Sequence, residues 1–158
     1  MIIEAIDAAP RSPRVVVQAL LFAGNGDVLL VEPVDRPGWE VPGGYLRAGE
    51  SPAEACVRAV REELGLDPRV GDLLVVDWVP GEEWDTLVYV FDAGTHPGFD
   101  DESEVLPLDP SRHVDWTLTS AAHLHWRLDG EVLDRTRLAL TAGTPLGHTL
   151  YLERGAPR

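Results

Sequence analysis

The chain has 158 residues, a length typical of one domain, and its 27 acidic and 13 basic residues give it a formal net charge of −14. A surface this negative repels a phosphate backbone, which argues against nucleic acid as a partner, whereas a polyphosphate screened by divalent cations is compatible with it. A single cysteine, Cys56, excludes an internal disulfide, and we expect one domain over residues 1–158.

The first residues do not resemble an export signal. The opening sequence MIIEAIDAAPRSPR carries Glu4 and Asp7 and lacks a basic segment followed by an apolar run. The longest apolar stretch, VVVQALLFA from Val15, is interrupted by Gln18 and is too short to cross a bilayer. We therefore expect a cytoplasmic protein without a membrane partner, in which residues 1–13 form a loose N-terminal arm.

Short apolar segments rich in β-branched residues alternate with turns along the chain. Residues 15–23 and 28–33 flank the turn sequence GNGD and predict a hairpin. The segment EVPGGYL predicts a short strand or a glycine turn, and the C-terminal TLYLERG a short strand or an extended tail. Further strands are predicted at 72–80, 86–94 and 113–118, and helices at 51–64, 119–128 and 131–143. This order predicts an α/β fold with helices flanking a sheet.

The helix predicted at 51–64 has well-marked ends. Ser51 is a good N-cap, Glu54 completes a capping box with it, and Gly65 suits a left-handed cap at the C-terminal end. At about 100° per residue, one arc of the helix is apolar and is expected to face the core. That arc contains Ala53, Cys56, Val57, Val60 and Leu64.

Two consecutive carboxylates, Glu62 and Glu63, lie beside this apolar arc, with Ala59 between them and one turn earlier. Adjacent carboxylates repel each other unless a cation holds them. They are either a solvated pair with ion pairs such as Arg58–Glu62, or hard oxygen ligands for Mg²⁺. The spacing alone does not decide between these interpretations.

Glycines precede the helix in the segment WEVPGGYLRAGE. The adjacent Gly43 and Gly44 allow close backbone approach, and Gly49 adds a second flexible position directly before Glu50. A strand–loop–helix unit of this kind can direct backbone groups and a helix N-terminus towards phosphate.

The segment 44–66 resembles the signature of the Nudix hydrolases, and WEVPGG resembles the lead-in to that signature. Eight of its nine specified positions agree. The matching residues are Gly44, Glu50, Arg58, Val60, Glu62, Glu63, Gly65 and Leu66. The resemblance implies an α/β/α sandwich around a mixed β-sheet, with the signature as a loop–helix–loop motif.

The resemblance also implies an activity, namely Mg²⁺-dependent hydrolysis of a diphosphate linkage in a nucleoside diphosphate derivative of small size. It implies that Glu62 and Glu63 hold Mg²⁺ or Mn²⁺, and that Glu50 and Arg58 brace the loop against the helix. The residues themselves, apart from the resemblance, make Gly43, Gly44 and Arg47 candidates for a loop that contacts phosphate, with ordinary surface charge as the alternative for Arg47. The cation would activate a water molecule for attack on phosphorus.

The ninth signature position, where the family has a glutamate, is Ala59. Alanine can neither bind a cation nor accept a proton, so another carboxylate replaces it or the domain binds nucleotides without hydrolysing them. The acidic loop at 95–112 is about eighteen residues long, and loops of this length are usually associated with function or disorder. We expect Glu102 or Glu104 from this loop to act as the base, and the turn GEEWD, with Glu82, Glu83 and Asp85, is a second source. The oligomeric state is open, with a homodimer as one alternative.

Overall fold

The structure is a computed structural model that describes residues 12–100, 106–143 and 147–158. Its helices are α1 (Pro52–Leu64) and α2 (Gly130–Ala142), and two short 3₁₀ helices span Pro97–Asp100 and Ala121–Trp126. Its strands are β1 (Arg14–Phe22), β2 (Val28–Pro33), β3 (Gly43–Tyr45), β4 (Leu73–Val79), β5 (Thr86–Thr95), β6 (His113–Thr119), β7 (Leu150–Glu153) and β8 (Ala156–Pro157). No helix in the described part of the chain is long and apolar enough to span a membrane.

The strands described form one mixed sheet in the order β6-β2-β1-β5-β4-β7-β8, with β3 paired to β1. The β1–β5 and β4–β7 pairs are parallel and the remaining pairs are antiparallel. β3 pairs with β1 at residues 16–18, whereas β2 meets β1 only near Phe22. This pairing places the segment that leads into α1 directly on the central strands.

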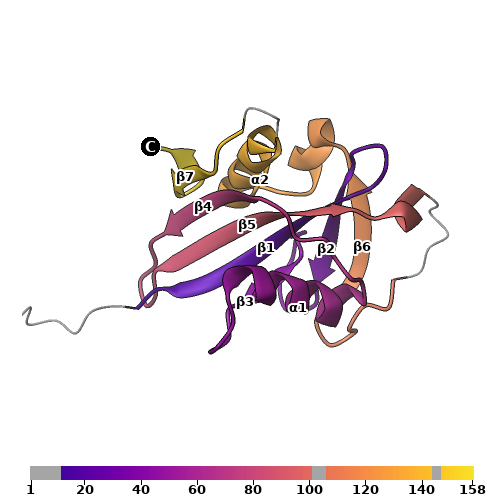
Figure 1. The fold of residues 1–158 in the computed structure, drawn as a ribbon, viewed down its shortest axis with the longest axis horizontal. Coiled ribbons are helices and arrows are strands. Elements are labelled where there is room, and N and C mark those ends of the chain that lie inside the picture. Colours follow the sequence, from indigo (N-terminus) through magenta and orange to yellow (C-terminus); the bar gives the residue numbers. More distant parts are fainter. Residues whose placement is uncertain (1–11, 101–105, 144–146) are drawn as a thin grey trace, which may run out of the picture.

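The helices lie on opposite faces of the sheet, with α1 below and α2 above it in the view of Figure 1. Side chains alternate along β1, so Val17, Ala19 and Leu21 pack on the α1 side and Leu20 on the other. The α1 side includes Cys56, Val60 and Leu64, and the α2 side includes Ala139 and Ala142. The expected α/β/α sandwich with a mixed sheet is confirmed.

One element differs from the predictions. The segment 119–128 contains a 3₁₀ helix at Ala121–Trp126 and no α-helix. That 3₁₀ helix buries only Leu124, so it lacks the apolar stripe that stabilises a longer helix. At the C-terminal end, TLYLERG takes the strand alternative of its prediction, because it contains β7, which forms an antiparallel hairpin with β8.

A buried ion pair joins the second helix to the sheet. Arg135 of α2 donates to Asp77 of β4 at 2.6 Å and to Gln18 of β1 at 3.1 Å. The amide of Gly155, in the turn between β7 and β8, also donates to Asp77 at 3.1 Å. The C-terminal TLYLERG segment is therefore fixed to the sheet edge by a carboxylate that is fully buried.

Candidate metal and phosphate site

The loop before α1 owes its path to glycine. A Cβ on Gly43 would lie 1.9 Å from the carbonyl oxygen of Val17, so only glycine allows β3 to approach β1 this closely. Gly49 and Gly65 have φ values of 84° and 66°, and these left-handed turns begin and end the helical part of the motif. Ser51 and Glu54 form the predicted capping box.

Arg58 ties this loop to the helix. Its guanidinium donates to both oxygens of Glu50, with an Nη2–Oε2 distance of 3.0 Å, and to the carbonyl oxygen of Tyr45 at 2.8 Å. The amide of Arg47 donates to the same carboxylate at 3.0 Å. The hydrogen bond from Arg58 is the main reason that the pKa of Glu50 falls to about 2. Glu50 and Arg58 thus make the contacts expected of a brace.

Glu62 is surrounded by guanidinium groups. Arg47 donates to its Oε1 at 2.9 Å and to its Oε2 at 3.1 Å, in a bidentate arrangement. Arg58 donates to Oε2 at 3.2 Å, and Arg112 lies 3.9 Å from the same oxygen. The ion pair between Arg58 and Glu62 that the sequence suggested is therefore present, with two further arginines beside it.

Glu63 has a different environment, because its side chain is buried and only 4% of the residue is exposed. The amide of Gly43 donates to Oε2 at 3.1 Å, while Oε1 lies 4.0 Å from Nε2 of His113. The same His113 nitrogen lies 3.7 Å from a carboxylate oxygen of Glu40. Burial raises the pKa of Glu63 to about 7, and the charges on Glu40 and Glu62 add to this effect.

The helix faces differ in part from the prediction. Glu63 lies within the buried face and not beside it, and Ala53 is exposed although it was expected in the core. The buried face includes Ala55 and Ala59, one turn apart. Ala59 is 1% exposed and packs against the loop. A Cβ added to Gly44 in that loop would lie 3.4 Å from the Cβ of Ala59.

Three residues near the carboxylates were not singled out from the sequence. Glu40 is held by an isolated bridge to Val31 of β2, and His113 begins β6, which pairs with the other edge of β2. Arg112 precedes His113 in the chain. Glu40 belongs to the WEVPGG motif, so the sequence offered a signal that it lies near the site. The approach of His113 to Glu63 and of Arg112 to Glu62 has no such signal, because it depends on strand pairing.

The acidic loop that was expected to supply the base is described only in part. Glu102 and Glu104 lie outside the described residues. Asp109, from the same loop, accepts hydrogen bonds from the amide and hydroxyl of Ser111 at 2.9 and 2.6 Å. Its own carbonyl accepts from the amides of Arg112 and His113. Asp109 thus stabilises the turn that carries Arg112 into the site.

The chemistry of the donor set suits a hard divalent cation. Glu62 and Glu63 provide carboxylate oxygens, the ligand type of Mg²⁺ and also of Mn²⁺. Across residues 12–100, 106–143 and 147–158, no group of three or more His, Cys, Asp or Glu side chains is placed to hold a metal ion. The two glutamates could therefore contribute to a cation site, without a third protein carboxylate in the described part of the chain.

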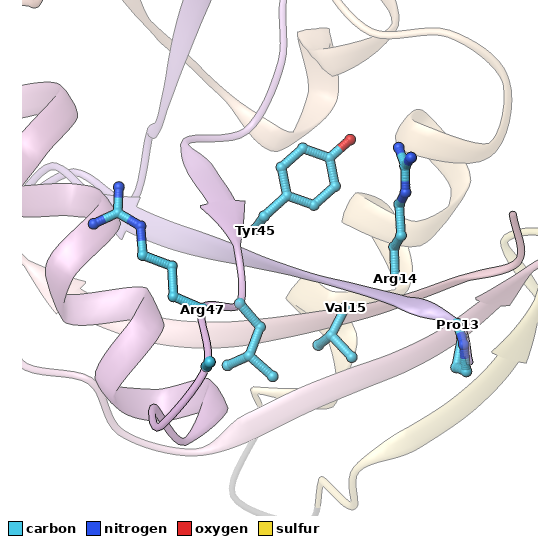
Figure 2. A pocket seen from close by; sticks show the side chains of 7 residues that line it. Pro13, Arg14, Val15, Tyr45 and Arg47 are labelled. Atoms are coloured by element: carbon cyan, nitrogen blue, oxygen red, sulfur yellow. The ribbon is translucent and has the colours of Figure 1, made fainter.

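A cavity of about 460 Å³ adjoins the loop and is lined by residues 13–15 and 45–48. Figure 2 shows Tyr45 and Arg14 projecting to one side of the strands, while Arg47 extends towards the neighbouring helix. Tyr45 is 59% exposed, and the guanidinium of Arg14 lies 4.7 Å from the ring centroid of Trp84. Arg47 thus lines the cavity and also contacts Glu62.

The fold and the site together define an α/β sandwich protein with a glutamate-bearing loop–helix–loop motif against its sheet. The family model of the NUDIX domain matches residues 12–136, and the chain belongs to this family.

The chain is similar to the RNA pyrophosphohydrolase of Gluconacetobacter diazotrophicus, at 37% identity over 82 residues that cover 46% of this chain and 49% of the relative. The chain spans about half the length of this curated relative, and it spans 39% of the RNA pyrophosphohydrolase of Psychrobacter cryohalolentis. The MutT protein of Methanosarcina mazei Go1 has a similar fold, with a TM-score of 0.65, 22% identity and coverage of 77% and 86% of the two chains. A UDP-X diphosphatase has a TM-score of 0.68, 19% identity and coverage of 94% and 70%.

Proposed function

We propose that the protein hydrolyses a diphosphate linkage in a small nucleotide derivative, using Mg²⁺ or Mn²⁺. The observation that carries this proposal is the buried carboxylate of Glu63 next to Glu62, on a helix that Arg58 and Glu50 hold against the loop. Membership of the NUDIX family supports it.

The residues have distinct proposed roles. Glu63 and Glu62 hold the cation, and the amide of Gly43 fixes the orientation of the Glu63 carboxylate. When bound, the cation neutralises phosphate charge and lowers the pKa of a water molecule that attacks phosphorus. Gly43 and Gly44 keep the loop backbone close to the sheet, and Arg47 contacts phosphate. Glu102 or Glu104 takes the proton from the attacking water.

The substrate is proposed only as a class. The relative from Gluconacetobacter diazotrophicus is named RNA pyrophosphohydrolase, so a short RNA with a 5′-triphosphate belongs in the test set beside small nucleotides. A net charge of −14 disfavours a long RNA backbone, and we favour a small nucleotide. The proposal includes a cytoplasmic location and leaves a homodimer as one alternative.

A second candidate function is nucleotide binding without hydrolysis. Ala59 removes a carboxylate that the family signature contains, and the described residues offer no three-ligand group. This candidate predicts that nucleotides bind in the presence of Mg²⁺ but are recovered unchanged.

One experiment separates the two candidates. The protein is incubated in ¹⁸O-labelled water with Mg²⁺ and a panel of nucleoside triphosphates, nucleotide sugars, ADP-ribose, dinucleoside polyphosphates and a 5′-triphosphate RNA. Hydrolysis predicts one labelled phosphate product per turnover in the mass spectrum, and Glu63→Gln should suppress it at least about hundredfold. The Asp134→Asn variant, altered at an exposed position of α2 on the opposite face of the sheet, is the control (Figure 1). Unchanged nucleotides throughout would exclude hydrolysis of these compounds.

A further inference from the structure

Arg47 lies between two regions that a phosphate-containing substrate would use. Its two terminal nitrogens contact both oxygens of Glu62, at 2.9 and 3.1 Å. Arg47 also lines the cavity of about 460 Å³ next to the start of β1 and the end of β3. The side chain is 55% exposed, so it can change partners without disturbing the core.

The contacts of Glu62 set up a competition. A carboxylate has about four lone-pair sites. Arg47 takes one on each oxygen, and Arg58 takes another on Oε2. A divalent cation on this carboxylate would also lie within a few ångströms of the Arg47 guanidinium, and the two positive charges repel each other. An exposed ion pair is weak enough for such a cation to displace it.

The adjoining cavity offers a new partner for the displaced guanidinium. Arg14 also lines the cavity, with its guanidinium 4.7 Å from the ring centroid of Trp84, so an anion there would have a second arginine nearby in a strongly acidic protein. The exposed ring of Tyr45 stands beside them and presents a face on which a nucleobase can stack (Figure 2).

We propose that Arg47 exchanges partners: a divalent cation takes its place on Glu62, and the released guanidinium binds a phosphate of a nucleotide lodged between Tyr45 and Arg14. This inference rests on the proposed function, since it assumes that Glu62 contributes to the cation site. It makes Arg47 a positioning residue that couples binding of the cation to binding of the substrate. By linkage, the phosphate compound must tighten binding of the cation by the same factor by which the cation tightens binding of the phosphate compound.

Calorimetric titration of Mn²⁺ without any phosphate compound tests the competition. In Arg47→Gln the cation no longer displaces the Arg47 ion pair, while the contacts of Arg58 and Arg112 with Glu62 remain, so Mn²⁺ affinity should rise by up to about fivefold. The matched control is Arg61→Gln, because Arg61 lies on α1 with 59% exposure and pairs with Asp67, not with Glu62. Equal Mn²⁺ affinities in the two variants would overturn the exchange.

The second arm measures coupling with methylenediphosphonate, a diphosphate analogue whose P–C–P bridge resists hydrolysis. In the parent and in Arg61→Gln, saturating analogue should tighten Mn²⁺ binding at least about tenfold, a typical size for coupling between two sites, once the Mn²⁺ bound by free analogue is subtracted. In Arg47→Gln this factor should be smaller, because only the direct attraction between the cation and the phosphate remains. A coupling factor that Arg47→Gln leaves intact would overturn the claim that Arg47 reaches phosphate.

Failure of the proposed function has a different signature. If Glu62 and Glu63 do not hold the cation, the Glu63→Gln variant binds Mn²⁺ as the parent does, and the family assignment of the ligands is wrong. If Glu63→Gln loses Mn²⁺ binding but the Arg47 and Arg61 variants behave alike, the cation site stands and only the exchange fails.

Discussion

Ala59 packs against Gly44, so closely that a Cβ on Gly44 would lie 3.4 Å from the Cβ of Ala59. The family signature has a glutamate at position 59, yet here the position is 1% exposed and lies one turn before Glu63. A glutamate would need room between the helix and the loop. The alanine therefore lets the loop lie closely on α1, and it removes one negative charge from beside Glu63.

Replacing Ala59 with glutamate should make stability depend on a divalent cation. Without a cation, a third carboxylate at this buried position is repelled by Glu62 and Glu63. This repulsion and the burial of the charge should lower the free energy of unfolding by about 3 kcal/mol. Mg²⁺ should restore part of this loss by binding the folded state. Thermal melting in EDTA and in a Mg²⁺ series measures both effects.

The matched control is Ala55→Glu, which places the same charge one turn earlier on the same buried face. That glutamate has no neighbouring carboxylate pair, so its destabilisation should not respond to Mg²⁺. An equal Mg²⁺ response in both variants would show that position 59 does not face the cation. Increased turnover in Ala59→Glu would identify the parent as a weakened hydrolase.

Glu63 should make the stability of the protein depend on pH when EDTA removes free divalent cations. Its folded pKa of about 7 lies above the ordinary glutamate pKa of 4.5, so the folded state binds more protons than the unfolded state between these values. The free energy of unfolding should then fall as pH rises from about 4.5 to about 7, by about 3 kcal/mol. Urea denaturation at several pH values checks this slope.

The comparison with Glu63→Gln tests this effect. Burial lowers the pKa of His113, which gives the opposite slope on the acidic side in both proteins. Because His113 Nε2 lies 4.0 Å from Glu63 Oε1, the difference between the two curves should contain the Glu63 slope and the coupling between these two groups. Parallel curves would show that Glu63 ionises normally. Mn²⁺ affinity of the parent should also rise with pH through about 7, because the cation displaces a proton.

Local signals allowed much of the motif to be predicted from the sequence. Ser51 and Glu54 form the capping box, and Gly65 ends α1 in a left-handed conformation, because caps depend on neighbouring residues only. Glu50 and Arg58 meet as the family resemblance implied. The strands at the hairpin and in the centre of the sheet followed from β-branched apolar runs.

The different environments of Glu62 and Glu63 could not be predicted in this way. A helical wheel places them 100° apart, but only the sheet decides which of the two is buried. The approach of His113 to Glu63 also has no local signal, because it depends on pairing between β2 and β6. The C-terminal segment is placed by Asp77, which is distant from Gly155 in sequence.

The buried pair between Asp77 and Arg135 should contribute strongly to stability. Changing Asp77 to Asn removes the charge that Arg135 needs while it stays buried, at 5% exposure. We expect a loss of about 3 to 5 kcal/mol, measured by urea denaturation. The control Asp67→Asn breaks an exposed pair with Arg61 and should cost less than about 1 kcal/mol. Similar losses in both variants would contradict this role for the buried pair.

The loop that contains Glu102 and Glu104 should supply the base that Ala59 does not. Of the two single substitutions Glu102→Gln and Glu104→Gln, one should lower turnover about hundredfold, the scale of a general base, and leave Mn²⁺ affinity unchanged. Asp109→Asn should behave differently, because Asp109 holds Ser111 and the turn before Arg112. The Asp109→Asn substitution should lower the free energy of unfolding and the substrate affinity rather than the rate of the chemical step. The control Asp134→Asn alters an exposed position of α2, outside this loop, and should keep the parent rate. If neither loop glutamate changes turnover, the proton goes to another group, and Glu40, which lies 3.7 Å from His113, is the described carboxylate to substitute next.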